Sequence, residues 1–201
     1  MHINSRLLFE KHARALFTPD ARVLEIGPDK APSTYRAVVG IQSLDWQTLN
    51  IIPAEQLTYL VKDEYPFPIA DNSFDIVLSG QVIEHVRKPW IWMKELARVC
   101  KTGGLVITIN PVSWPFHQAP VDCWRIFPEG MKSLYEEAGL RVFLCTMESL
   151  EPLCSRRSFD GIGAIDGEDR STLGALIKRA VGWPVSRATD VITIGSKLPS
   201  A

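Results

Sequence analysis

Short apolar runs alternate with amphipathic segments along this chain. The apolar runs are rich in β-branched residues and end at Gly, Pro or Asp, which is typical of buried strands. The predicted strands cover residues 22–26, 41–44, 58–61, 74–78, 105–109, 141–146 and 190–194. Helical spacing of apolar positions, with stops at Pro or Gly, predicts helices over residues 5–17, 89–100, 131–138 and 173–181. This alternation predicts an α/β fold, with a doubly wound, mostly parallel, seven-stranded sheet and helices on both faces.

The whole chain, residues 1–201, is long enough to form one such domain with a full hydrophobic core. A polar stretch from Glu148 to Thr172 and the short apolar helix that follows it separate the last two predicted strands. We interpret residues 148–188 as an insertion on the single domain rather than as a second domain.

Composition narrows the function classes. A net charge of −1 gives no basic excess for a nucleic-acid surface. The four cysteines form no CxxC pair, so no zinc or other metal site is expected. The first 17 residues mix charged with apolar positions, unlike a signal peptide, and no segment reaches the roughly 20 apolar residues of a membrane span. We therefore expect a cytoplasmic protein in a reducing compartment.

The segment from Pro66 to Val86, PFPIADNSFDIVLSGQVIEHV, is the most informative in the chain. A polar turn leads into the apolar run Phe74–Leu78, and two small residues end that run. A polar stretch with Glu84 and His85 follows. This is the pattern of a buried parallel strand that opens at its carboxyl end into a ligand crevice.

Polar residues also follow the earlier predicted strands. Glu25 and Gly27 close the first strand, and glycine lets a ligand approach the backbone closely. Asp45 ends the second, 20 residues after Glu25, the separation at which α/β nucleotide-binding folds place a carboxylate on ribose hydroxyls. Trp46 carries a ring that can pack on adenine. Each residue alone is explained as well by an ordinary surface or turn position, but their joint placement at successive strand ends favours a ligand site.

Four segments resemble the motifs of class I S-adenosylmethionine-dependent methyltransferases of the small-molecule, type 11 group. They are VLEIGP, SLDW, YPFPIADNSFDIVLSGQVIEHV and ELARVCKTGGLVITIN, in this order from Val23 to Asn110. The resemblance implies a Rossmann-like fold and an enzyme of class EC 2.1.1.-, which transfers a methyl group from S-adenosyl-L-methionine to a small-molecule acceptor. The stretch Asp122–Gly130, DCWRIFPEG, is similar to methyltransferases of sugar and cell-envelope biosynthesis, which suggests a sugar or glycan precursor as acceptor.

The cofactor contacts that this resemblance implies all follow strand ends. They are Glu25 and Gly27 near the methionine part, Asp45 on the ribose with Trp46 against the adenine, Asp63 or Glu64 near the adenine amine, and Gly80 and Gln81 after the fourth strand.

An alcohol acceptor needs a base, and histidine titrates near neutral pH. His85 and His117 are the candidates, although a structural turn role explains His85 equally well. His117 lies in a proline-rich loop after the fifth strand, which suits the wall of an acceptor pocket. Asp122 and Arg125 are expected to orient the acceptor, and Trp114 to stack on a sugar or to pack in the core.

The loop after Gly27 departs from the family pattern, because Pro28-Asp29-Lys30-Ala31 replaces its later glycines. A second interpretation therefore stays open, a non-catalytic binding or partner protein with the same fold. A third, a nicotinamide-dependent oxidoreductase, is disfavoured because no G-x-G-x-x-G follows the first strand. The sequence leaves the oligomeric state open.

Overall fold

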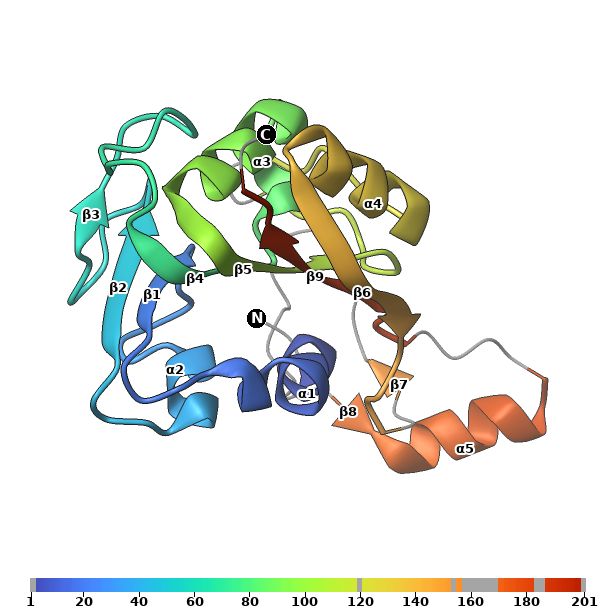
Figure 1. Ribbon diagram of the computed structural model, residues 1–201. Coiled ribbons are helices and arrows are strands. Elements are labelled where there is room, and N and C mark those ends of the chain that lie inside the picture. Colours follow the sequence, from blue (N-terminus) through green and yellow to red (C-terminus); the bar gives the residue numbers. More distant parts are fainter. Residues whose placement is uncertain (1–2, 119–120, 153–154, 157–169, 183–186, 200–201) are drawn as a thin grey trace.

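A twisted sheet of seven strands forms the centre of the protein (Figure 1). The computed structural model describes residues 3–118, 121–152, 155–156, 170–182 and 187–199. The strands follow the order β3-β2-β1-β4-β5-β9-β6 across the sheet. Their bounds are β1 Arg22–Ile26, β2 Asp45–Asn50, β3 Tyr59–Leu60, β4 Phe74–Gly80, β5 Cys100–Pro111, β6 Leu140–Glu148 and β9 Asp190–Lys197.

Strand β9 runs antiparallel to both of its neighbours, β5 and β6, and the other pairs in the sheet are parallel. The predicted mostly parallel sheet is therefore confirmed. From β1 the chain moves outward through β2 to β3, and it then returns to the other side of β1 with β4. The strand order thus reverses between β1 and β4, and ligands of open α/β sheets bind outside the carboxyl ends of strands at such a point.

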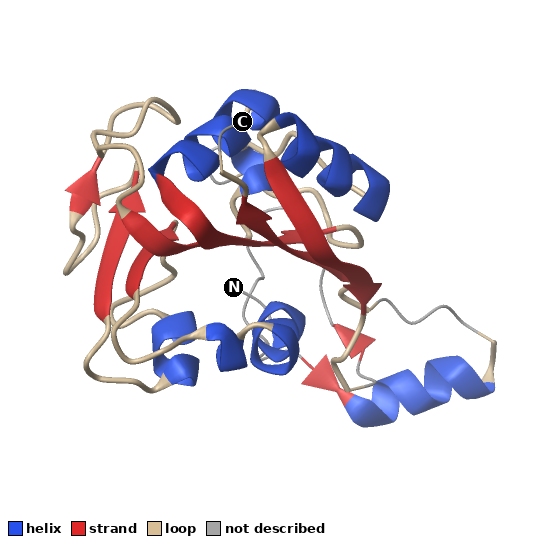
Figure 2. Ribbon diagram, in the orientation of Figure 1, coloured by secondary structure: helices blue, strands red, loops and turns tan. Residues whose placement is uncertain are grey.

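Helices cover both faces of the sheet (Figure 2). One face carries α1 (Ile3–His12), the short helix η1 (Arg14–Leu16) and α2 (Thr34–Val39); the other carries η2 (Ile83–His85), α3 (Pro89–Val99) and α4 (Pro128–Glu137). Each face buries its own apolar cluster, with Phe9 and Tyr35 on the first and Trp92 and Met93 on the second. Apolar burial on two faces of one sheet is the main stabilising term of such a fold. Within the described ranges, no helix combines the length and apolarity that crossing a membrane requires.

The predicted second strand over residues 41–44 is wrong. These residues form a turn, and the strand begins at Asp45. Helix α2, which the sequence analysis missed, ends immediately before the turn at Gly40, whose φ is 70°. Ile41 and Leu44 pack against the core from a loop. Their apolar side chains gave this loop a sequence pattern like that of a short strand.

The N-terminal helix and the insertion are partly as predicted. The helix predicted over residues 5–17 is divided into α1 and η1. In the insertion, α5 (Thr172–Ala180) confirms the predicted apolar helix, and β7 (Ser155–Arg156) pairs antiparallel with β8 (Arg170–Ser171). Residues 153–154, 157–169 and 183–186 of the insertion lie outside the described residues.

Gly80 at the end of β4 makes room for a buried tyrosine. A Cβ atom at this position would lie 2.0 Å from the hydroxyl oxygen of Tyr35, which is held by Ser5 at 2.6 Å. Gly80→Ala is therefore expected to lower the free energy of unfolding by about 3 kcal/mol, at the upper end for overpacked cores. Urea unfolding measures this loss. Gly103→Ala is the control: a Cβ there meets nothing within 4 Å, so only the backbone at a φ of 78° is penalised, by about 1 kcal/mol. A Gly80→Ala protein as stable as the Gly103→Ala protein would contradict the packing argument.

Candidate functional site

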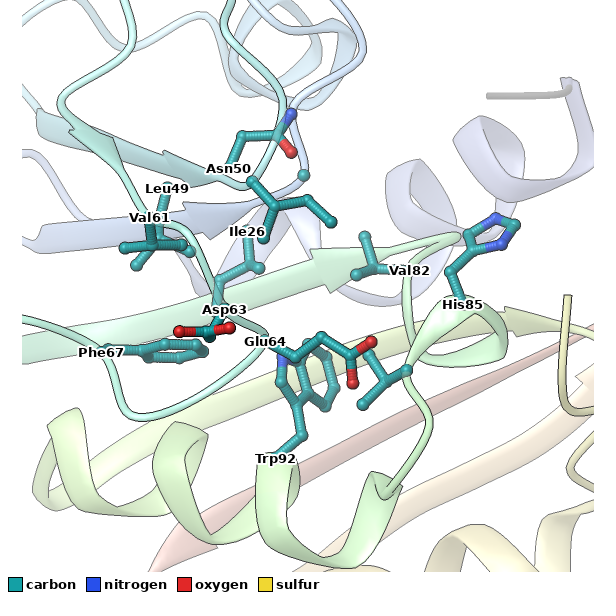
Figure 3. A pocket seen from close by; sticks show the side chains of 13 residues that line it. Ile26, Leu49, Asn50, Val61, Asp63, Glu64, Phe67, Val82, His85 and Trp92 are labelled. Carbon is teal, nitrogen blue, oxygen red and sulfur yellow. The ribbon is translucent and has the colours of Figure 1, made fainter. Parts of the chain in front are cut away.

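A pocket opens at the carboxyl ends of β1, β2 and β4, where the strand order reverses (Figure 3). The space between its walls, including the solvent-open part, is about 400 Å³. Its apolar wall is formed by Ile26, Leu49, Ile51, Val61, Phe67, Val82, Val86 and Trp92, and its polar groups come from Asn50, Asp63, Glu64 and His85. Mostly apolar walls with a few polar groups are typical of small-molecule sites.

Gly27 lies where the chain leaves β1 and lines this pocket. Its backbone N–H donates to the carbonyl of Leu49 at 2.9 Å, and its φ is 68°, a conformation that favours glycine. A Cβ atom here would lie 2.5 Å from a methyl group of Val82, which also lines the pocket. The absence of a side chain at Gly27 therefore lets Val82 pack directly against the backbone of this turn. The close approach of a ligand to Gly27 stays a prediction.

Asp45 does not lie at this edge of the sheet. It is the first residue of β2, in register with Arg22 at the start of β1, and its carboxylate accepts from the Arg22 side chain at 2.7 Å. The hydrogen bond from Arg22 lowers the pKa of Asp45 below its ordinary value. The expectation that Asp45 follows a strand was wrong because it depended on the misplaced strand, and with it the reason for a ribose contact is lost.

Asn50 occupies the position that Asp45 was expected to hold. It is the last residue of β2, it lines the pocket, and its side-chain oxygen accepts from the backbone N–H of Ile52 at 3.2 Å. The sequence analysis missed it because the run DWQTLN has few consecutive apolar residues. The two buried positions of this strand, Trp46 and Leu49, are three residues apart, so the sequence offered no alternating pattern that would have marked a strand ending at Asn50.

Glu25 and Trp46 are buried together on the α1–α2 face of the sheet. Glu25 is 1% exposed, and its carboxylate accepts from the Ser33 hydroxyl at 2.5 Å and from the Trp46 indole N–H at 2.8 Å. Burial raises the pKa of Glu25 to about 7. The Trp46 ring stacks on Phe17 with ring centroids 5.6 Å apart. Trp46 is therefore a core residue and not an exposed platform for adenine, which corrects that expectation.

Asp63 and Glu64 follow β3 and both line the pocket, as predicted for residues at this strand end. Glu64 accepts from the backbone N–H of Arg87 at 3.0 Å and from its guanidinium at 2.9 Å. Asp63 is exposed at the pocket mouth (Figure 3). The geometry therefore leaves Asp63 better placed than Glu64 to meet a ligand.

Gly80 ends β4 and Gln81 follows it, but neither residue lines the pocket. The free space at Gly80 is taken by Tyr35, on the opposite face of the sheet from α3. Gln81 has a φ of 61°, and its side-chain amide donates to Asp190 at 3.2 Å. The cofactor contacts predicted for these two residues are therefore not supported by the pocket geometry.

The loop whose residues were predicted to contact the methyl acceptor is held against η2 by hydrogen bonds. The backbone N–H of Cys123 donates to the carbonyl of Glu84 at 2.7 Å, and the Trp124 indole donates to the carbonyl of Val86 at 2.9 Å. His85 Nδ1 forms a hydrogen bond with the carbonyl of Val121. These contacts bring His85 and His117 together, with ring centroids 4.9 Å apart. Their role as bases stays a prediction.

Asp122 and Arg125 form an ion pair inside this loop. Arg125 donates to both carboxylate oxygens of Asp122, at 2.5 and 2.7 Å, and to the carbonyls of Trp114 and Pro115 at 3.3 and 3.1 Å. Asp122 also accepts from the backbone N–H of His117 at 2.8 Å. These contacts hold the loop in shape, and Trp114 is half-buried beside them. We therefore do not assign acceptor contacts to Asp122, Arg125 or Trp114.

Glu84 was not among the site residues predicted from the sequence. Its side chain is 1% exposed, and neither carboxylate oxygen has a hydrogen-bond partner among the described residues. Burial raises the pKa of Glu84 to about 8, and burial also lowers the pKa of neighbouring His85. The sequence signal was the polar pair Glu84-His85 directly after a buried strand.

Comparison with known proteins agrees with this geometry. A family profile described as a methyltransferase domain matches residues 41–108. An uncharacterized methyltransferase of Mycobacteroides abscessus is 37% identical over 100 residues, which are 47% of this chain and 33% of that protein. The matched segment thus spans a third of the relative's length.

Two solved structures have similar folds. Phosphoethanolamine N-methyltransferase 2 of Haemonchus contortus, solved with S-adenosyl-L-methionine, superimposes with a TM-score of 0.62 at 16% identity, over 98% of this chain and 53% of the other. The [4+2]-cyclase SpnF gives a TM-score of 0.61 at 16% identity, over 97% and 81%. At such identity the likeness shows the fold alone, and the cyclase illustrates that this fold serves more than one reaction. The domain profile over residues 41–108, the motif order and the strand order agree, and together they support a class I S-adenosylmethionine-dependent methyltransferase domain in this chain.

Proposed function

We propose that this protein binds S-adenosyl-L-methionine in the pocket at the β1–β4 switch point and transfers its methyl group to a small-molecule acceptor. The observation that carries the proposal is the mostly apolar pocket that Gly27 and Val82 line at the point where the strand order reverses. The cofactor supplies an activated methyl group on a positively charged sulfur. The protein then has to position two partners, which is the main contribution of an enzyme to such a transfer.

The residues present fit this cofactor. The apolar wall between Ile51, Phe67 and Val82 suits the adenine ring, and Asp63 at the mouth can accept from its exocyclic amine. Asn50 replaces Asp45 in our assignment of the ribose contact, because its side chain lies at the carboxyl end of β2. An amide serves this purpose because it can both donate to and accept from a hydroxyl.

The acceptor would lie toward His85 and His117, beyond the pocket wall that His85 contributes. Both rings are largely buried, with side chains 14% and 13% exposed, which limits the access of water to a transfer step. As candidate bases they act on an acceptor hydroxyl, and a sugar or glycan precursor is the class that the stretch Asp122–Gly130 suggests.

A non-catalytic binding protein with this fold is the second candidate. It is favoured by the loop after Gly27, in which the Asp29 carboxylate accepts from the backbone and hydroxyl of Thr34 at 2.9 and 2.7 Å. These bonds fasten the loop to the start of α2. Such a protein binds ligand in the same pocket but forms no S-adenosylhomocysteine when acceptors are added.

Two aspartate variants test the location of the cofactor. Asp63→Ala is expected to weaken S-adenosylmethionine binding by about fivefold, the effect of losing one hydrogen bond worth about 1 kcal/mol. Asp45→Ala, the matched control, removes a carboxylate at the other end of the strands and is expected to leave the affinity unchanged. Calorimetric titration measures both. Weaker binding by the Asp45→Ala protein with normal binding by the Asp63→Ala protein would reverse our assignment.

A further inference from the structure

Glu84, His85 and His117 converge beside the proposed cofactor pocket. One ligand atom from each residue lies within 4.8 Å of the other two. Glu84 and His85 are held by the short helix η2, and His117 is held by the loop that Asp122 and Arg125 fasten. The cluster is therefore built by two separate segments of the chain, each fixed by its own hydrogen bonds.

The Glu84 carboxyl group lacks a hydrogen-bond partner among the described residues. Both of its oxygens are buried, and the described residues offer neither of them a hydrogen bond. The nearest cationic candidate is the Nε2 atom of His85, 3.7 Å from one oxygen, which is beyond hydrogen-bond distance. A buried carboxyl group without a partner is costly, so such groups are normally paired or coordinate a metal ion.

Both histidine rings are oriented in the way that metal-binding histidines usually are, with one ring nitrogen hydrogen-bonded to the protein. His85 uses Nδ1 for the carbonyl of Val121, and His117 uses Nδ1 for the carbonyl of Pro115 at 3.1 Å. A neutral ring that donates from Nδ1 keeps a lone pair on Nε2. Metal-binding histidines are oriented in this way, through a carbonyl or a carboxylate on the second nitrogen. Asp122 supplies such a carboxylate 3.4 Å from Nδ1 of His117.

We propose that Glu84, His85 and His117 bind a divalent first-row transition metal ion through one carboxylate and two imidazole groups. Two histidines and a carboxylate form a recurrent ligand set that leaves coordination positions open for water or a substrate. The proposal replaces the expectation of no metal, which depended on the spacing of the cysteines.

The role of the metal rests on the proposed function. An acceptor hydroxyl oxygen bound at an open position would lose its proton to solvent water more readily, and it would be held near the cofactor pocket that His85 also lines. The two histidines would then be ligands and not bases. The acceptor class is a small molecule with a hydroxyl group, or two neighbouring hydroxyl groups, able to coordinate the metal.

Titration of the metal-free protein with Zn²⁺ tests the site without cofactor or acceptor. We expect one high-affinity site by calorimetry, and visible absorption of the Co²⁺ form. Glu84→Gln, which preserves shape, and His117→Ala, in a loop, are each expected to weaken Zn²⁺ binding by about 100-fold, because each removes a direct ligand. Two controls should keep wild-type affinity: His12→Ala, whose ring binds Glu148, and Cys123→Ser, which removes an exposed thiol.

The outcomes separate this inference from the proposed function. Thermal unfolding establishes that each variant folds, and S-adenosylmethionine binding is measured on the same samples. Absence of Zn²⁺ and Co²⁺ binding in a protein that binds S-adenosylmethionine would overturn the metal site and leave the function standing. Metal binding that survives both Glu84→Gln and His117→Ala would also overturn it. Metal binding without cofactor binding would instead reject the proposed function.

Discussion

Replacing Glu25 by glutamine is expected to remove a pH dependence of stability worth about 3 kcal/mol. The folded protein holds this carboxyl group at a pKa of about 7, above the ordinary 4.5, because it is buried. The folded state therefore binds the proton more tightly than the unfolded state, and the resulting stabilisation is fully present below about pH 4.5. It is lost as the pH rises through about 7, and a shift of this size corresponds to about 3 kcal/mol. Glutamine carries no charge at any of these pH values.

The measurement is the free energy of unfolding of both proteins in urea at about pH 4.5 and about pH 8. The Glu25→Gln protein should gain stability relative to wild type by about 3 kcal/mol between these conditions. Its side-chain oxygen can still accept from Ser33 and Trp46, so the fold is expected to persist. Glu129→Gln, at a glutamate whose side chain is 85% exposed, is the control and should change stability by less than about 0.5 kcal/mol. A stability difference for Glu25→Gln that is the same at both pH values would show that the carboxyl group is not held protonated.

Gly27→Ala is expected to weaken S-adenosylmethionine binding by about tenfold to a hundredfold. The new methyl group would lie 2.5 Å from Val82, so the Val82 side chain is displaced into the pocket or the backbone shifts. Forcing the displaced group back to admit the cofactor costs about 1 to 3 kcal/mol, the range for overpacked sites, and each 1.4 kcal/mol lost on binding changes the affinity about tenfold. Calorimetric titration at equal protein concentration measures the change.

Gly139→Ala is the matched control for this variant. Gly139 has a φ of 76°, close to that of Gly27, but a Cβ atom there meets nothing within 4 Å. Both variants therefore bear a similar backbone penalty, and only Gly27→Ala displaces a side chain that lines the pocket. Equal affinity of the two proteins for S-adenosylmethionine would mean that the cofactor does not bind against Gly27.

The sequence predicts most of this sheet because buried strands leave strong local patterns. Strands β1, β4 and β9 are nearly continuous apolar runs, and their positions were found to within a few residues. Strand β2 was misplaced because it is half-buried near one edge of the sheet and therefore mixes polar and apolar residues. This single error placed the predicted ribose contact at Asp45, at the opposite end of the strand from Asn50.

Contacts between side chains that are far apart in the sequence were harder to predict than the strands. Glu25 and Trp46 meet through tertiary packing across 21 residues of chain, so their burial could not be inferred from local pattern. His85 and His117 were selected as chemical candidates on their residue type, and the structure brings them together through contacts between η2 and the loop around Val121. The unpartnered carboxyl group of Glu84 is visible only when the surroundings of both segments are known.

Calorimetric titration of S-adenosyl-L-methionine into the wild-type protein tests the central claim most directly. The account predicts saturable binding of one cofactor molecule per chain, with competition by S-adenosylhomocysteine for the same site. A folded protein that gives no binding heat at millimolar cofactor, at two temperatures, would contradict it.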